Sequence, residues 1–194
     1  VYIGFGAESA SKPVLDRMKK GGFILTRGMT PKVVNGEHYE FPTTMFEGIK
    51  KCKEVNIHAN CTWIMAYPGE TLQHLKTTVG FILWQQDYYA SFGDKPDSVN
   101  RRLFVATAYP GTEMFKEPKA RAILSKNFSI KFDAAGDPEC DDNLRFYVGE
   151  LDDATKVMHD QEGRPLNFGA MDDDTFLRVR ELADGGQIEK VLDL

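Results

Sequence analysis

Short apolar runs alternate with amphipathic segments along the first 125 residues of the chain. Runs rich in β-branched and aromatic residues predict three strands, at 1–6, 56–66 and 102–108. Apolar residues at helical spacing predict helices at 11–22, 43–54, 70–90 and 112–125. Between the first two helices, residues 22–41 carry Gly, Pro and Asn-Gly signals that indicate an excursion, such as a hairpin.

Helix-end signals sharpen two of these boundaries. Ser11 is placed to cap the first helix, Pro13 lies in its first turn, and Gly21 is expected just beyond its end. Thr44 and Glu47 have the spacing of a capping box at the start of the second helix.

The order strand, helix, strand, helix, strand, helix predicts an α/β fold with parallel strands joined by right-handed crossovers. Such alternation belongs to barrel or doubly wound α/β folds. A closed (β/α) barrel needs eight such units and three are visible, so residues 1–125 look like part of a barrel, an open half-barrel of TIM-like type. Residues 126–194 are acidic and turn-rich before a last helix at 171–186, and they predict a mostly irregular and helical C-terminal extension.

Each predicted strand ends in a loop with glycine, hydroxyl groups and a glutamate. The three loops are "GFGAESAS" (4–11), "AYPGETL" (66–72) and "AYPGTEM" (108–114). Ligands bind at the carboxyl ends of parallel strands, and glycine lets the backbone approach a ligand closely. A single Pro-Gly loop indicates only a turn, whereas three such loops on one face indicate a binding site.

The strand at 57–66 has one uniformly apolar parity and one that is small and largely polar. Because a parallel strand buried on both faces should be apolar throughout, the second parity indicates a wet cavity that contains Asn60 and Thr62. His58 is interpreted as a satisfied core or rim residue. Cys61 lies on the apolar parity and is expected to be a buried, inert thiol.

Composition narrows the class of function. The net charge of −5 and the pI near 5.4 argue against a nucleic-acid surface. No apolar run is long enough for a membrane span, and no signal peptide is visible. Cys52, Cys61 and Cys140 form no close pair, so neither a zinc site nor a disulfide framework is indicated, and a reducing cytoplasm is expected. Because residue 1 is Val, we expect the chain to start inside a larger gene product or to have been trimmed.

Three stretches together resemble the second half of a radical S-adenosylmethionine (SAM) enzyme core. They are "IGFGAESASKPVLDRMKKG", "GIKKCKEVNIHANCTWIMAYPGETLQHLKTTVGFI" and "ATAYPGTEMF". The resemblance covers residues 1 to about 116 and is greatest to the branch that often carries a cobalamin-binding domain. It implies the later strands of a partial barrel.

The resemblance also implies roles for individual residues. Glu8 and Ser9 match the position that binds the SAM ribose, and Lys20 matches the cation that meets the SAM carboxylate. The segment from Ile64 to Ala66 matches the strand end that lies against the adenine. The adenine pocket is then closed by the last matching stretch, Tyr109, Pro110, Gly111 and Thr112. Ribose hydroxyls need acceptors, a carboxylate needs a cation, and adenine needs apolar contact, so these residue types suit their roles.

The chain departs from this family in three places. Ala66 stands where the family usually has glycine, and the 22–41 excursion is longer than the usual link and is expected to contact substrate. The CxxxCxxC motif that binds the [4Fe–4S] cluster is absent, and the three cysteines cannot imitate it. We therefore expect a fragment that binds SAM and positions a small-molecule substrate but is inactive alone. The rest of the barrel, the cluster and any cobalamin would come from a missing N-terminal part.

Two other functions are compatible with the same residues. A non-catalytic α/β module could use its open sheet edge for assembly, including homodimer formation. Glu8, Glu70 and Glu113 could instead supply a carboxylate pair for hydrolysis, although an acid at a helix start is favoured by the helix dipole alone.

Overall fold

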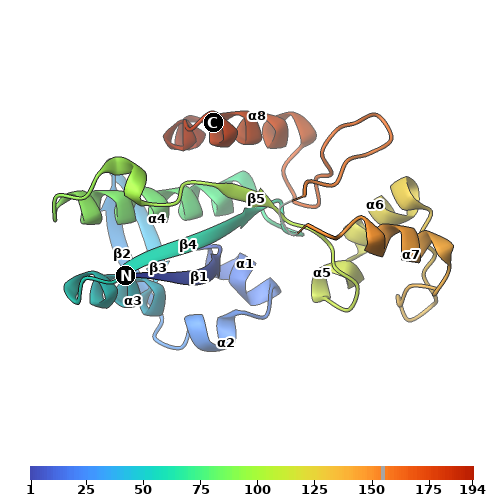
Figure 1. Ribbon diagram of the computed structural model, residues 1–194, viewed down its shortest axis with the longest axis horizontal. Coiled ribbons are helices and arrows are strands. Elements are labelled where there is room, and N and C mark those ends of the chain that lie inside the picture. The colour runs from blue at the N-terminus through green and yellow to red at the C-terminus, as the bar shows by residue number, and fades with distance from the viewer. Residues whose placement is uncertain (154–155) are drawn as a thin grey trace.

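The computed structural model describes residues 1–153 and 156–194, apart from the side chain of Pro96, as a mixed α/β molecule (Figure 1). Within these residues, β1 (Tyr2–Glu8), β4 (His58–Met65) and β5 (Leu103–Val105) form a sheet in the order β1-β4-β5. Both pairings are parallel, which confirms the predicted α/β class. The described strands do not close into a barrel, so the half-barrel assignment stays a prediction.

Helices and one hairpin connect these strands. Between β1 and β4 lie α1 (Lys12–Arg17), α2 (Gly21–Ile24), β2 (Met29–Val34), β3 (Glu37–Pro42) and α3 (Thr43–Glu54). Between β4 and β5 lie α4 (Leu72–Ala90) and the short 3-10 helix η1 (Pro96–Ser98). After β5 follow α5 (Glu113–Lys116), α6 (Pro118–Phe128), α7 (Asp142–Gly149), α8 (Asp173–Asp184) and the 3-10 helix η2 (Ile188–Asp193).

One predicted helix end and one predicted helix cap are wrong. The first helix stops at Arg17 because Lys19 adopts a left-handed conformation with φ 57°, and Gly21 begins α2 instead of ending α1. The start of α3 is set by Pro42 at the N-cap position, where no side chain caps the helix, so the Thr44–Glu47 capping box is not formed.

The alternation predicted for β4 is confirmed. Ala59, Cys61 and Trp63 are buried against helices, whereas Asn60 and Thr62 on the other face are exposed. The buried face packs on α4, whose start is fixed by a reciprocal cap between Thr71 and His74. The sheet therefore has one covered face and one open face.

The excursion at 22–41 ends in the predicted hairpin, in which β2 and β3 pair in antiparallel fashion around Asn35 and Gly36. This hairpin belongs to the hydrophobic core. Phe41 is fully buried, and its ring centroid lies 4.9 Å from that of Phe81 on α4. The expectation that this segment contacts substrate finds no support, because none of its described residues lines the cavity at the strand ends.

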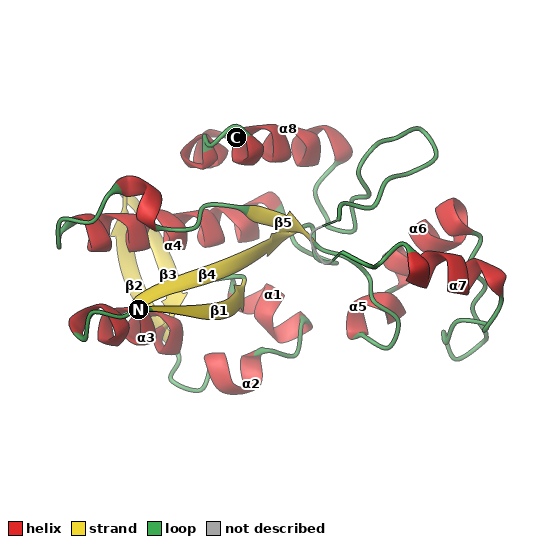
Figure 2. Ribbon diagram, viewed as in Figure 1, coloured by secondary structure: helices red, strands yellow, loops and turns green. Residues whose placement is uncertain are grey.

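The C-terminal extension divides between two hydrophobic clusters. Phe176 and Val179 of α8 pack into the main core with β4 and α4. In contrast, α7 of the extension joins α5 and α6, which begin before it, in a second cluster beyond the carboxyl ends of β4 and β5 (Figure 2). The boundary predicted near residue 125 stays a prediction. The last helix is nevertheless an integral part of the main core.

Among the described residues, no helix combines the length and the apolar character that crossing a bilayer requires.

Candidate functional site

A cavity of about 360 Å³ lies at the carboxyl ends of the three parallel strands. It lies between the strand ends, the segment after α1 and the start of α5. Its lining residues are Glu8, Met18, Lys20, Ile64, Tyr67, Phe104, Val105, Ala106, Thr107, Tyr109, Thr112, Glu113 and Met114. This is the face on which the sequence predicts a binding site.

The charged part of the cavity is an ion pair between Lys20 and Glu8. The Lys20 Nζ lies 2.5 Å from the Glu8 Oε1, and Nζ also donates to the carbonyl of Gly6 at 3.5 Å. Glu8 has a φ of 63° at a register shift of β1, so the strand turns its last side chain toward Lys20. Such a left-handed conformation is unusual for glutamate and often marks a functional position.

A second cation–carboxylate pair lies at the same cavity. The Lys19 Nζ is 3.6 Å from the Glu113 Oε2, and both side chains are largely exposed. Tyr67 closes the adjoining wall, where its hydroxyl donates to the carbonyl of Arg17 at 3.5 Å. Burial, followed by the charges of Glu117 and Glu113, raises the pKa of Tyr67, so this phenol stays protonated and can donate.

The two Ala-Tyr-Pro-Gly stretches form the same turn. The N–H of Glu70 donates to the Tyr67 carbonyl at 2.8 Å, and the N–H of Thr112 donates to the Tyr109 carbonyl at 3.1 Å. Gly69 and Gly111 have φ of 79° and 85°, as the third position of a type II turn requires. After each turn a threonine caps the next helix: Thr71 caps α4 and Thr112 caps α5.

The first of these turns carries two unusual residues. Ala66 has a φ of 62°, a left-handed conformation that glycine accepts without cost but that is strained for alanine. Glu70 is fully buried, and burial raises its pKa to about 8, although the N–H groups of Ala66 and Tyr67 lower it in part. Neither carboxyl oxygen of Glu70 has a hydrogen-bond partner among the described residues. The two N–H groups therefore lie near the carboxyl group without reaching hydrogen-bond geometry.

The cavity gathers five of the eleven residues predicted to bind the ligand: Glu8, Lys20, Ile64, Tyr109 and Thr112. Ser9 lies elsewhere. It is fully buried, and its Oγ forms a 3.1 Å hydrogen bond with Thr78 Oγ1 on α4, so it anchors the end of β1.

The other predicted residues lie around this cavity without lining it. Asn60 and Thr62 are on the open face of β4, further from its carboxyl end, and Thr62 donates to the Phe5 carbonyl at 3.3 Å. Pro110 and Gly111 form the second turn, and Ala66 is buried behind Tyr67.

Several residues that line the cavity were not predicted from the sequence. Tyr67 could have been found, because it occupies the same place in its motif as Tyr109. Phe104 is paired in register with Ile64, so a prediction that Ile64 lines the cavity also predicts that Phe104 lines it. Met18 gave no such signal, since it reaches the cavity only because α1 ends one turn earlier than predicted.

His58 and Cys61, the histidine and the cysteine of β4, have structural roles. His58 Nε2 lies 2.6 Å from the Ser98 carbonyl, consistent with a satisfied histidine. Burial raises the pKa of the Cys61 thiol to about 12, as expected for an inert cysteine. No group of three His, Cys, Asp or Glu side chains is placed to hold a metal ion in the described part of the chain.

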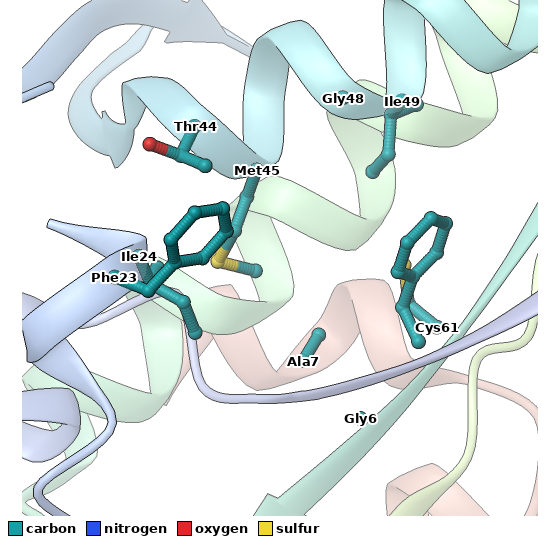
Figure 3. Close-up of a pocket in the computed structure, with 10 residues that line it drawn as sticks. Gly6, Ala7, Phe23, Ile24, Thr44, Met45, Gly48, Ile49 and Cys61 are labelled. Atoms are coloured by element: carbon teal, nitrogen blue, oxygen red, sulfur yellow. The ribbon is translucent and has the colours of Figure 1, made fainter. Parts of the chain in front are cut away.

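A second cavity, also of about 360 Å³, is apolar and lies beside β1 on the other side of the sheet (Figure 3). Phe23 and Ile24 of α2, Met45 of α3 and Cys61 of β4 line it. β1 is the edge strand of the described sheet, and its Tyr2 side chain is 78% exposed. This region combines an unpaired strand edge with exposed apolar side chains.

Comparison with known proteins gives one distant relative. The chain is 25% identical over 122 residues to a protein of Pyrococcus horikoshii described as an uncharacterized methyltransferase. The similar region is 63% of this chain and 20% of that protein, so the chain spans about one fifth of the length of the relative it matches. No protein-family model matches the chain. No solved structure matches it either.

Proposed function

We propose that the chain forms one wall of an S-adenosylmethionine site in a methyl-transferring enzyme. The observation that carries this proposal is the Glu8–Lys20 pair, which lies in a cavity that Ile64 and Phe104 also line. A carboxylate, an ammonium group and apolar side chains are the three kinds of group that the ribose, the carboxylate and the adenine of this ligand need. The description of the Pyrococcus horikoshii relative as a methyltransferase is a second, independent support.

Each residue has a defined task in this proposal. The Glu8 carboxylate accepts hydrogen bonds from the two ribose hydroxyls. Lys20 turns its ammonium group from Glu8 to the ligand carboxylate, and Ile64 and Phe104 contact the adenine. A hydrogen bond to a charged group contributes about 1.5–3 kcal/mol, so either ionic contact changes affinity measurably.

Within this proposal, the enzyme belongs to the radical SAM class, as the sequence resemblance implies. That class forms a 5′-deoxyadenosyl radical or uses cobalamin in methyl transfer, with a [4Fe–4S] cluster as the electron source. The donor set of this chain does not fit the cluster, because Cys52, Cys61 and Cys140 differ in burial and are not grouped. We assign the cluster and any cobalamin to residues outside this chain, and we expect the chain alone to be inactive.

Calorimetric titration of S-adenosylmethionine tests the binding site. We expect Glu8→Ala to weaken binding about tenfold, since one charge-assisted contact is lost. Glu40→Ala is the matched control, because this glutamate is exposed on the β3 hairpin strand. Equal affinity of the unmodified chain and the Glu8 variant would overturn the assignment.

A second candidate function is assembly through the edge of β1. The exposed residues Tyr2, Ile3 and Phe5 of this strand, together with Phe23 beside the apolar cavity, favour it. An uncovered strand edge pairs readily with another chain, whether a further part of the same protein or a second copy. Sedimentation distinguishes the cases, since a dimer that Phe5→Lys dissociates would support self-assembly and a monomer at all concentrations would exclude it.

A further inference from the structure

We propose that residues 167–171 of the C-terminal extension form a strap that holds the loop 66–70 in the conformation that the ligand site requires. This inference rests on the proposed function, because it assigns a positioning role toward the same site. Its starting point is that the loop carries a strained residue and a buried acid, and both need external support.

The strain is located at Ala66, whose φ of 62° lies in the left-handed region. This conformation costs an alanine roughly 1–2 kcal/mol, and it persists only where the surrounding structure holds it in place. The loop also encloses the Glu70 side chain, whose carboxyl oxygens lack hydrogen-bond partners among the described residues. Opening the loop would relax Ala66 and hydrate Glu70, so the closed loop needs an opposing restraint.

The strap supplies this restraint by direct contact. A Cβ atom at Gly169 would lie 3.0 Å from the Ala66 Cα and 3.3 Å from the Glu70 carbonyl oxygen, so the strap backbone packs against both residues. The N–H of Ala170 donates to the Glu70 carbonyl at 2.7 Å. Contacts this short are tighter than most Cβ contacts, so any larger residue at this position would push the two backbones apart.

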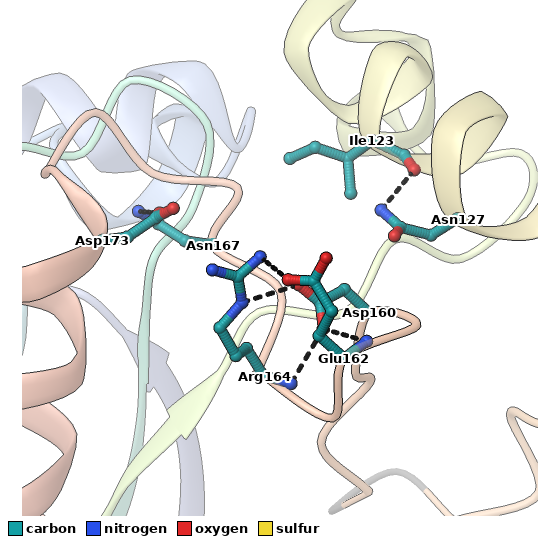
Figure 4. A network of polar contacts seen from close by, with 7 residues as sticks. All are labelled: Ile123, Asn127, Asp160, Glu162, Arg164, Asn167 and Asp173. Carbon is teal, nitrogen blue, oxygen red and sulfur yellow. Dashed lines mark hydrogen bonds and ion pairs between the residues drawn. The ribbon is translucent and has the colours of Figure 1, made fainter.

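The strap is itself rigid. Asn167 is buried, and its Oδ1 accepts from the N–H of Gly169 at 3.0 Å. Its Nδ2 donates to the Met171 carbonyl at 2.8 Å. The same Nδ2 donates to Asp173 Oδ1 at 3.0 Å, a contact that Figure 4 shows. Lys119 of α6 donates to the Gly169 carbonyl from the other side. The strap is therefore attached both to the first turn of α8 and to α6.

These contacts connect the extension to the ligand. Ala66 immediately precedes Tyr67, which lines the cavity, and Glu70 immediately precedes the Thr71 cap of α4. A shift of the strap displaces Ala66 and with it the Tyr67 wall. The extension thus sets the affinity of the site without lining it.

Gly169→Ala tests the strap with two readouts, amide hydrogen exchange of the loop and affinity for S-adenosylmethionine. We expect exchange of the amides between Ala66 and Thr71 to become about tenfold faster and affinity to fall by a similar factor, while β4 keeps its protection. Gly149→Ala is the control, because no described atom lies within 4 Å of a Cβ at that position in the same extension.

Lys119→Met is a milder second variant, which removes one anchor without introducing a buried clash and should act in the same direction. Unchanged loop exchange in both variants would overturn the strap, and so would faster exchange with unchanged affinity. If the unmodified chain failed to bind the ligand, the proposed function would fail and the strap would lose its role in affinity. The exchange rates of the loop amides would then show whether the strap holds the loop.

Discussion

The ammonium group of Lys20 lies 2.5 Å from the Glu8 carboxylate, in a cavity where three parallel strands end. The two side chains are 41% and 22% exposed, so the pair itself contributes about 1 kcal/mol or less to folding. In the proposed function its importance is in recognition, since the pair would place opposite charges at the two positions where a nucleoside with an amino-acid tail needs them.

Gly6→Ala should disturb this pair without unfolding the chain. A Cβ at position 6 would lie 2.9 Å from Glu8 Oε1, which is the end of a flexible side chain and can move aside. We expect the affinity for S-adenosylmethionine to fall several-fold, with little change in the unfolding free energy. Gly4→Ala on the same strand is the control, because no described atom lies within 4 Å of its Cβ. Equal losses of affinity in both variants would contradict the prediction.

The two Ala-Tyr-Pro-Gly turns predict unequal effects of one substitution. Ala66 and Ala108 are both fully buried, so replacing either with glycine removes a buried methyl group and adds freedom to the unfolded chain. Only Ala66, with a φ of 62°, regains roughly 1–2 kcal/mol from relief of the left-handed conformation, so Ala66→Gly should be close to neutral. Ala108→Gly should destabilise the fold by about 1 kcal/mol, since Ala108 is not in the left-handed region. Urea unfolding measures both values, and equal destabilisation by the two substitutions would refute the strain at Ala66.

Glu70 predicts a pH dependence of stability. Its pKa is raised by burial from 4.5 to about 8, so between these values the unfolded state loses a proton that the folded state keeps. The contribution of Glu70 to the unfolding free energy is fully present below pH 4.5. It is lost as the pH rises to about 8, at up to roughly 1.4 kcal/mol per pH unit. Glu70→Gln should remove this slope in urea unfolding, whereas Glu113→Gln, at an exposed position, should keep it. Parallel profiles of the Glu70 variant and the unmodified chain would contradict the prediction.

The hairpin of β2 and β3 is predicted to stabilise the whole fold. Phe41→Ala should lower the unfolding free energy by about 3–5 kcal/mol, because this fully buried ring contacts Phe81 and would leave a cavity. Val33→Ala on the same hairpin should cost much less, since Val33 is 57% exposed. Comparable losses in the two variants would show that the hairpin is not part of the core.

Local sequence patterns predicted the elements well where periodicity decides the structure. The alternation along 57–66 identified both faces of β4, and the helix expected at 43–54 has those bounds in the structure. The shortened α1 was missed because the left-handed conformation of Lys19 has no glycine or asparagine to signal it. The role of the hairpin was also missed, since an Asn-Gly turn predicts a hairpin but not the surface on which it packs.

The sequence motifs predicted where the candidate site lies, but they did not predict all the contacts that build and support it. Glu8 and Lys20 came from the family resemblance, and the structure places them in one cavity. Ser9 does not line the cavity, because β1 ends at Glu8 and the Ser9 side chain bonds Thr78 on α4; the register shift next to Glu8 is invisible in sequence. Contact of Gly169 with Ala66 joins residues about a hundred positions apart, and no local pattern reports such a contact.

The central claim is that Lys20 recognises the carboxylate of S-adenosylmethionine. The most direct measurement compares the affinities of this ligand and of 5′-methylthioadenosine, which lacks the amino-acid tail, for the unmodified chain and for Lys20→Met. Lys12→Met is the control, because Lys12 pairs with Asp16 on the exposed side of α1. The account predicts that Lys20→Met weakens binding of S-adenosylmethionine about tenfold and leaves that of 5′-methylthioadenosine unchanged. Equal weakening of both ligands, or of neither, would contradict it.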